Sequence, residues 1–291
     1  MLRALAIKTI CWSFPADALS IRQLTHLEFG GLLSSDMFSE ILSNGHQLES
    51  LILSGPLKCA PSSLFREHCT SLPFLRYFSL DITRLQRQAY LDNDLCPAIS
   101  EFLRPRTQLR TYRLFVPREE HRHIGFDASA WGVLPALANL RSLSMSYPND
   151  LSPALAGWLI PRTVQALTLE LSAITTEATS FLKVSHSLCC THLRSRDHCL
   201  LQQIRPGVPP ALKYIGLMSS VSIRSVKSIV EHGFPQVRVV KIGGNIWSIT
   251  RTEEGPFHVE QWPYRRVRYQ AEEWLESMEC SDAIWKGVHG M

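Results

Sequence analysis

The sequence predicts an α/β solenoid, a fold in which short parallel strands stack in chain order and helical segments connect them. Three observations predict it. A six-residue apolar motif recurs along the 291-residue chain, the copies follow one another at a nearly regular interval, and capped amphipathic segments lie between them.

The recurring motif has the form L-x-x-L-x-L, as in LRSLSM at residues 140–145. The intervals between successive copies are 22, 24, 27, 34, 31, 24, 48 and 25 residues, and the interval of 48 leaves room for a degenerate copy, LCCTHL, at Leu188. The nine clear copies begin at Leu2, Leu24, Leu48, Leu75, Leu109, Leu140, Val164, Leu212 and Val237.

Each copy predicts one strand with a buried face. Successive side chains of a strand point to opposite faces, so the second and third apolar residues of the motif share one side. A single unit cannot bury that side alone, whereas stacked units build one continuous core.

The segments between the copies predict helices. SSDMFSEILSNG (34–45) begins with a Ser/Asp cap, carries apolar residues at helical spacing and ends in Asn-Gly. Three further segments follow the same design, namely 95–105, 175–184 and 222–234.

The copies resemble leucine-rich repeat proteins, whose consensus continues with Asn or Cys. The variable interval and the helical segments are similar to the ribonuclease-inhibitor-like class and to fungal F-box/leucine-rich-repeat proteins. Only Asn245 matches the consensus Asn or Cys position. The resemblance implies a right-handed leucine-rich-repeat solenoid, with parallel strands on the concave face and helices or irregular segments outside.

The same resemblance implies a function. F-box proteins carry an N-terminal helical module that docks onto a ubiquitin-ligase adaptor, and their repeats recognise the substrate. This chain starts directly in a repeat, and no F-box is visible in it. We therefore expect a non-enzymatic interaction module, related to the substrate-recognition domain of an F-box ubiquitin-ligase receptor. The alternative is a leucine-rich-repeat scaffold with no ligase connection.

The predicted organisation has three parts. Residues 1–247 form the solenoid, 248–262 form a loop, and 263–291 form a final strand at YRRVRY (264–269) followed by a capping helix. The capping helix is predicted over 271–285, because Trp274, Met278 and Trp285 share one helical stripe and solenoids need a covered end. The alternative for this segment is an amphipathic helix that binds a partner.

Composition narrows the function classes. The net charge of +4 is mild for this length, which argues against a nucleic-acid or membrane surface, since these need a concentrated basic face. No uninterrupted apolar run reaches about 18 residues, and eight irregularly spaced cysteines indicate reduced thiols. We expect a monomeric intracellular protein, cytoplasmic or nuclear, with a protein partner.

Four segments carry residue types that occur in chemical sites. HSLCCTHLRSRDHC (186–199) holds three Cys and three His, yet its spacing matches no structural zinc pattern. REEHRH (118–123) is interpreted as a solvated loop, and DND (92–94) as the cap of the following helix. The arginines of YRRVRY give weak support to nucleic-acid stacking. No catalytic motif is present, so we expect no enzyme, no metal and no cofactor.

The candidate binding residues are the strand residues that point away from the core. Aromatic and arginine side chains dominate interface energetics, so they are favoured among these outward positions. We expect Arg113 and Phe115, two apart on one strand, to hold a carboxylate-bearing peptide. The predicted partner-binding residues of the concave face are Tyr77, Arg113, Phe115, Tyr214, His26, Glu28 and Lys241.

Overall fold

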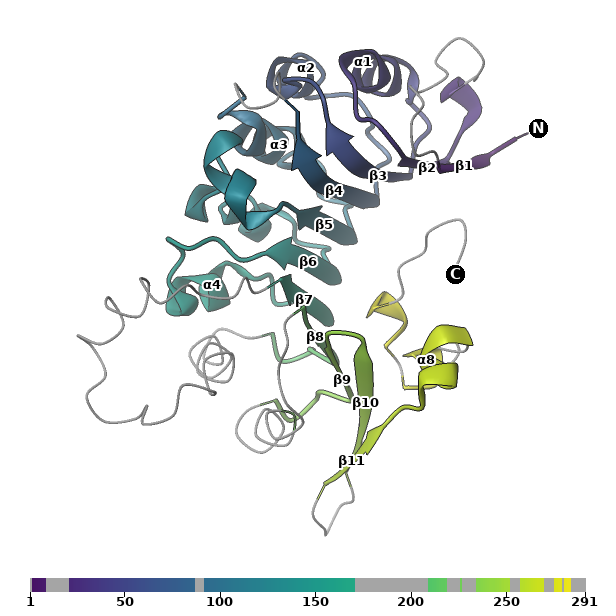
Figure 1. The fold of residues 1–291 in the computed structure, drawn as a ribbon, viewed down its shortest axis with the longest axis vertical. Helices are drawn as coiled ribbons and strands as arrows, with labels where there is room; N and C mark the ends of the chain where they lie inside the picture. Colours follow the sequence, from purple (N-terminus) through teal and green to yellow (C-terminus); the bar gives the residue numbers. More distant parts are fainter. Residues whose placement is uncertain are drawn as a thin grey trace. The chain divides into compact units, whose positions relative to one another are not determined.

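In the computed structural model (Figure 1) the chain forms two compact units. The first unit holds the described residues up to Leu151, and the second holds the described residues from Ser152 to Ala283. The structure describes residues 2–8, 21–86, 92–170, 209–218, 226, 234–251, 257–269, 275–278 and 280–283.

Six parallel strands build the sheet of the first unit, and they follow one another in chain order. Each strand coincides with one copy of the L-x-x-L-x-L motif. The strands are β1 (Ala4–Lys8), β2 (His26–Gly30), β3 (Ser50–Leu57), β4 (Tyr77–Leu85), β5 (Thr111–Phe115) and β6 (Ser142–Ser146).

Helices connect the strands and cover one face of this sheet (Figure 1). The helix predicted over 34–45 is confirmed as α1 (Ser35–Asn44): the Ser34 hydroxyl accepts from the Met37 N–H, and the Gly45 N–H donates to the Ile41 carbonyl. The helix predicted over 95–105 is confirmed as α3 (Leu95–Leu103). The other connections are η2 (Ile21–Gln23), α2 (Ser62–Glu67), η4 (Arg118–His123), η5 (Ala128–Trp131) and η6 (Leu134–Ala136).

The core lies between the helices and the sheet, and its middle is a chain of aromatic rings. The rings of Phe38 and Phe65 lie 5.5 Å apart, and those of Phe65 and Phe102 lie 5.2 Å apart, both edge to face. Phe78 then connects helix to sheet, since its ring lies 6.3 Å from Phe102 and 6.2 Å from Tyr112. The motif's apolar positions therefore supply the sheet half of this core.

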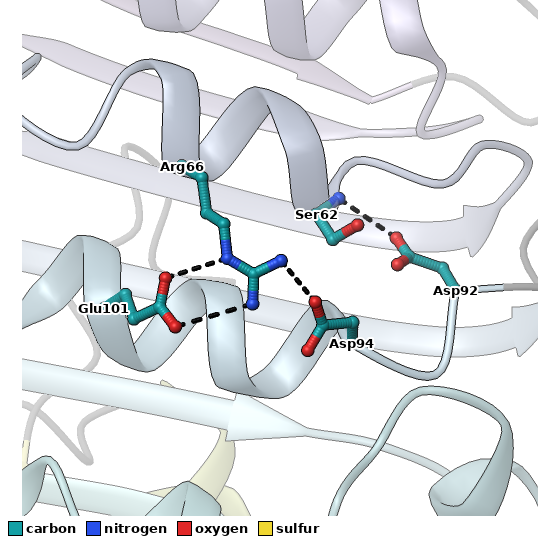
Figure 2. Close-up of polar contacts among 5 residues, drawn as sticks. All are labelled: Ser62, Arg66, Asp92, Asp94 and Glu101. Atoms are coloured by element: carbon teal, nitrogen blue, oxygen red, sulfur yellow. Dashed lines mark hydrogen bonds and ion pairs between the residues drawn. The ribbon is translucent and has the colours of Figure 1, made fainter.

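A polar network joins α2 to α3 on the outer side of this core (Figure 2). The Arg66 guanidinium binds the Asp94 carboxylate and donates to Glu101 through Nε at 2.8 Å. The Ser62 N–H donates to the Asp92 carboxylate at 3.0 Å. The prediction that DND (92–94) opens and caps the following helix is right in position, because Asp94 is the N-cap residue of α3. The Asp94 side chain makes no cap hydrogen bond, however, and the Asp92 carboxylate binds the first N–H of the neighbouring α2 instead.

The prediction that residues 118–123 form a solvated loop is wrong, because this segment is η4 and buries two polar side chains, Glu120 and His121. Glu120 accepts from the Leu85 N–H at 3.3 Å, at the end of β4. The His121 Nε2 donates to the Val116 carbonyl at 3.2 Å. Both bonds satisfy backbone groups where strands end, which is why these side chains are drawn inside.

Burial of His121 predicts a pH-dependent stability. Desolvation lowers the pKa of His121 below its ordinary value of 6.5, and within the described part of the chain its buried Nδ1 has no hydrogen-bond partner. The unfolded chain then takes up a proton at a higher pH than the folded chain. We expect stability to fall as pH drops from about 6.5 towards the lower folded-state pKa, and His121→Gln to flatten that slope.

Urea titrations at several pH values between 7 and 5, roughly the interval in which histidine charges, measure this effect. His46→Gln removes an exposed histidine and serves as the matched control, which should keep the parent slope. Equal slopes for the His121 variant and the parent would contradict the prediction.

The second unit contains three parallel strands that match the last three copies of the motif: β7 (Ala166–Glu170), β8 (Tyr214–Leu217) and β9 (Val239–Ile242). A Gly243–Gly244 turn, with Gly243 at a φ of 56°, leads from β9 into the antiparallel β10 (Asn245–Thr250). The remaining elements are α4 (Pro153–Leu159), β11 (His258–Gln261), α8 (Tyr264–Tyr269) and η8 (Ser281–Ala283).

Two predictions for the end of the chain are wrong. The expected loop over 248–262 contains most of an antiparallel β10–β11 pairing, in which Trp247 lies opposite Gln261. The expected strand over 264–269 is the helix α8, and the Val267 N–H donates to the Pro263 carbonyl at its start. Proline is well suited to begin a helix, and two consecutive arginines interrupt the strand alternation of this segment.

Several predictions fall on residues that the structure does not describe. These are the helix over 175–184, the degenerate copy at Leu188 and most of the helix over 222–234. Of that last helix only two residues are described: Val226, which is helical and buried, and Phe234, which is buried at its end. In the predicted capping helix, residues 275–277 are helical, whereas Trp274 and Trp285 lie outside the described residues.

The structure confirms the prediction of an α/β chain with mostly parallel strands, since all nine clear motif copies fall on β1 to β9. Among the described residues, no helix combines the length and the apolar character needed to cross a membrane.

Candidate protein-binding face

The candidate site in the first unit is the polar strand face, the side of strands β1–β6 that points away from the core. Strand register places its residues in rows that run across the sheet. The two central rows are Ala4, His26, Ser50, Tyr77, Thr111 and Ser142, and then Ala6, Glu28, Ile52, Ser79, Arg113 and Ser144.

Small residues occupy these rows where β6 crosses them. Ser142 and Ser144 lie next to Thr111 and Arg113 in the register. Because their side chains are short, the larger side chains of the neighbouring strands stand above them. The polar strand face therefore has a floor of short serine side chains on β6, next to the longer side chains of the neighbouring strand.

The residues near β1 and β2 carry opposite charges. Glu28 is buried, and its carboxylate lies 3.3 Å from the Lys8 ammonium. His26 is exposed, and its Nδ1 lies 2.8 Å from the Thr25 hydroxyl. Of these two predicted binding residues, His26 offers its ring to a partner, while the Glu28 carboxylate is engaged with Lys8.

Arg113 is half-buried and already has an acidic partner on the same face. Its Nη2 donates to the Asp81 carboxylate at 3.0 Å, and its guanidinium carbon lies 4.3 Å from the centroid of the Phe115 ring. The register places Asp81 opposite Phe115 on the adjacent strand. These three residues thus form one cluster, Asp81–Arg113–Phe115.

The expectation that Phe115 presents an open ring is wrong, because only 4% of the residue is exposed. Arg113 is also less available to a partner than expected, since the Asp81 carboxylate occupies one edge of its guanidinium.

The sequence analysis missed Asp81 as a residue of this face. A signal existed, because Asp81 follows LRYFSL directly, and strand alternation then places it on the same side as Tyr77 and Ser79. Tyr77 is half-buried and lies opposite Ser50 and Thr111.

Tyr214 and Lys241 belong to the second unit and lie on β8 and β9. Tyr214 is buried, with 6% of its surface exposed, and this burial raises the pKa of its hydroxyl, so the expectation of an exposed ring is wrong here too. Lys241 is half-buried and lies opposite Gly216. A Cβ at Gly216 would lie 2.7 Å from the Thr168 hydroxyl. The lack of a side chain at Gly216 therefore leaves room for the Thr168 side chain, which lies opposite it on the neighbouring strand.

The metal candidates give no site in the described part of the chain. No three His, Cys, Asp or Glu side chains among the residues with described positions come together as metal ligands. The Cys/His-rich segment at 186–199 lies outside the described residues. Burial raises the pKa of the Cys59 thiol to about 11, which keeps it protonated and poorly nucleophilic at neutral pH.

Comparison with known proteins assigns the chain to no family. No protein-family model matches the chain, and no curated protein has a sequence that matches it.

Proposed function

We propose that this chain is a non-enzymatic protein-interaction module that binds its partner on the polar strand face of the first unit. The more specific proposal is the substrate-recognition part of an F-box-type ubiquitin-ligase receptor, with right-handed leucine-rich repeats that place this face on their concave side. The observation that carries the proposal is the Asp81–Arg113–Phe115 cluster beside Tyr77 and a floor of serines.

The cluster suits a peptide with mixed chemistry. Asp81 and Arg113 offer one charge of each sign, both half-buried, and the short side chains of Ser142 and Ser144 lie beside Thr111 and Arg113 on the next strand. Their mutual ion pair holds the guanidinium in place, which reduces the conformational entropy lost when a partner binds. Aromatic and arginine side chains in such positions are the usual anchors of protein interfaces.

The alternative function is a leucine-rich-repeat scaffold unrelated to ubiquitin ligases. Its supporting observation is the same face, because the geometry of a binding surface does not depend on the process it serves. The two proposals differ in one measurable property, which is association of the full gene product with a cullin-ligase adaptor.

We expect Tyr77→Ala and Arg113→Ala each to weaken partner binding by about thirtyfold, or roughly 2 kcal/mol, as truncated interface anchors do. Proteins captured by the full gene product are identified first, and the affinity of the purified partner is then titrated against each variant. Arg122→Ala, on the exposed side of η4, is the matched arginine control.

Binding of both face variants within about twofold of the parent, with folding unchanged, would contradict the proposed face. Capture of a cullin-ligase adaptor supports the receptor proposal. Capture of a partner that depends on Tyr77 and Arg113, without any adaptor, supports the scaffold instead.

A further inference from the structure

A row of arginines lies immediately before the first residues of three successive strands of the first unit, β4, β5 and β6. Arg76, Arg110 and Arg141 each occupy the second position of the motif, in LRYFSL, LRTYRL and LRSLSM. The Arg110 N–H donates to the Arg76 carbonyl at 2.8 Å, and the Arg141 N–H donates to the Arg110 carbonyl at 2.8 Å. These bonds hold the three residues side by side, at the strand spacing of about 4.8 Å.

A hollow of about 240 Å³ opens along this row. Its lining residues are Arg76, Gln108, Arg110, Asn139 and Arg141. Gln108 and Asn139 stand two residues before Arg110 and Arg141, so two successive repeats each contribute one amide and one guanidinium. The volume lies below the roughly 300 Å³ at which drug-sized ligand sites begin, and it therefore suits a compact polar group.

The charges in the hollow are only partly balanced. Arg76 lies 3.5 Å from Glu49, which neutralises one of the three cations. Arg110 and Arg141 are exposed, and within the described ranges of the chain neither forms an ion pair. Like charges opposite one another on adjacent strands destabilise a sheet, so an anion that binds both arginines removes a repulsion as well as forming bonds.

The donors match a doubly charged oxyanion. A guanidinium presents its N–H groups in a planar fork, and two forks about one strand spacing apart reach different oxygens of one tetrahedral phosphate. The Asn139 amide nitrogen donates to the Thr107 carbonyl at 2.8 Å, which holds the side chain in place. Its Oδ1 can then accept from a donor near the anion, such as a peptide N–H.

We propose that the Arg110–Arg141 hollow binds a phosphomonoester group carried by a phosphorylated side chain of a polypeptide. The hollow accommodates one such group, whereas single-stranded nucleic acid needs a basic groove that follows several consecutive phosphates. The site lies at the start of the strands, separate from the Asp81–Arg113–Phe115 cluster, and it does not depend on the proposed ligase function.

The test measures the purified full chain against four probes: inorganic phosphate, a degenerate phosphoserine peptide library, the same library without phosphate, and an oligouridylate. Resonances of the arginine Nε–H groups report which guanidinium each probe contacts, and fluorescence anisotropy gives the affinities. We expect inorganic phosphate and the phosphopeptides to shift the signals of Arg110 and Arg141, and the unphosphorylated library to leave them unchanged.

Variants then separate this site from its surroundings. Arg110→Gln and Arg141→Gln are each expected to weaken phosphopeptide binding at least tenfold, and to leave thermal stability equal to or slightly above that of the parent because the repulsion is reduced. Arg104→Gln removes an exposed arginine outside the hollow and should bind like the parent. Tyr77→Ala should bind phosphate normally, so failure of the polar strand face and failure of this site are distinguishable.

Two results would overturn the proposal. One is the absence of phosphate-dependent shifts at Arg110 and Arg141 in the folded protein. The other is tighter binding of the oligouridylate than of the phosphopeptides, with the same arginine dependence, which assigns the hollow to nucleic acid.

Discussion

Phe102→Ala is expected to lower the free energy of unfolding by about 3–5 kcal/mol, the range for removing a buried aromatic ring. Phe102 lies on α3 with none of its surface exposed. Its ring contacts Phe65 of α2 and Phe78 of β4, and the Arg106 guanidinium carbon lies 3.4 Å from its centroid. The substitution leaves a cavity between two helices and the sheet, and it removes the ring against which a buried cation packs.

Urea denaturation followed by circular dichroism measures this loss. Phe74→Ala is the matched control, because Phe74 is 49% exposed, and it should change stability by no more than about 0.5 kcal/mol. A loss below about 1 kcal/mol for Phe102→Ala would show that the aromatic chain does not form as described.

Gly55→Ala is expected to destabilise the protein by about 3 kcal/mol or more, since it combines backbone strain with a steric clash. Gly55 has a φ of 143°, which L side chains rarely adopt, at the point where the pairing of β3 with β4 shifts register. A Cβ built there would lie 1.9 Å from the Gly31 carbonyl oxygen. That atom is backbone and cannot move aside as a flexible side chain does.

The control for this change is Gly244→Ala, because a Cβ at Gly244 meets nothing within 4 Å. Both variants lose the same backbone freedom in the unfolded chain, so their difference isolates the clash at Gly55. Melting temperatures within a degree or two of one another would refute the predicted strain, since even 1 kcal/mol shifts the melting temperature of a 150–250-residue domain by about 2–4 °C.

The parallel strands of both units and the helices α1 and α3 follow from local patterns in the sequence. The spacing of L-x-x-L-x-L places two apolar residues on one strand face, and each copy lies on one of the strands β1 to β9. Ser34 and Gly45 likewise mark the ends of α1. These features depend on residues close together in the chain, so the sequence alone is sufficient to predict them.

The strand β10, which pairs with β9 on one side and with β11 on the other, was predictable in part and was missed. Gly243 and Gly244 form a two-residue turn signal between apolar runs, which is typical of a hairpin. The residues of β10 do not alternate in the usual way, because Ile246, Trp247, Ser248 and Ile249 are all buried. A strand that is buried on both faces has no period-2 pattern, and for that reason the segment resembled a loop.

What the sequence alone determined is the order of the parallel strands, the direction of their apolar side chains and the candidate rows of outward residues. Only the tertiary structure decided which outward residues are open. Phe115 and Tyr214 occupy outward slots and are nevertheless buried, and Arg113 is paired with Asp81 of the neighbouring strand. The physical reason is that alternation within a strand sets the direction of a side chain, whereas its exposure and charge partners depend on neighbouring strands that are about 30 residues away in the chain.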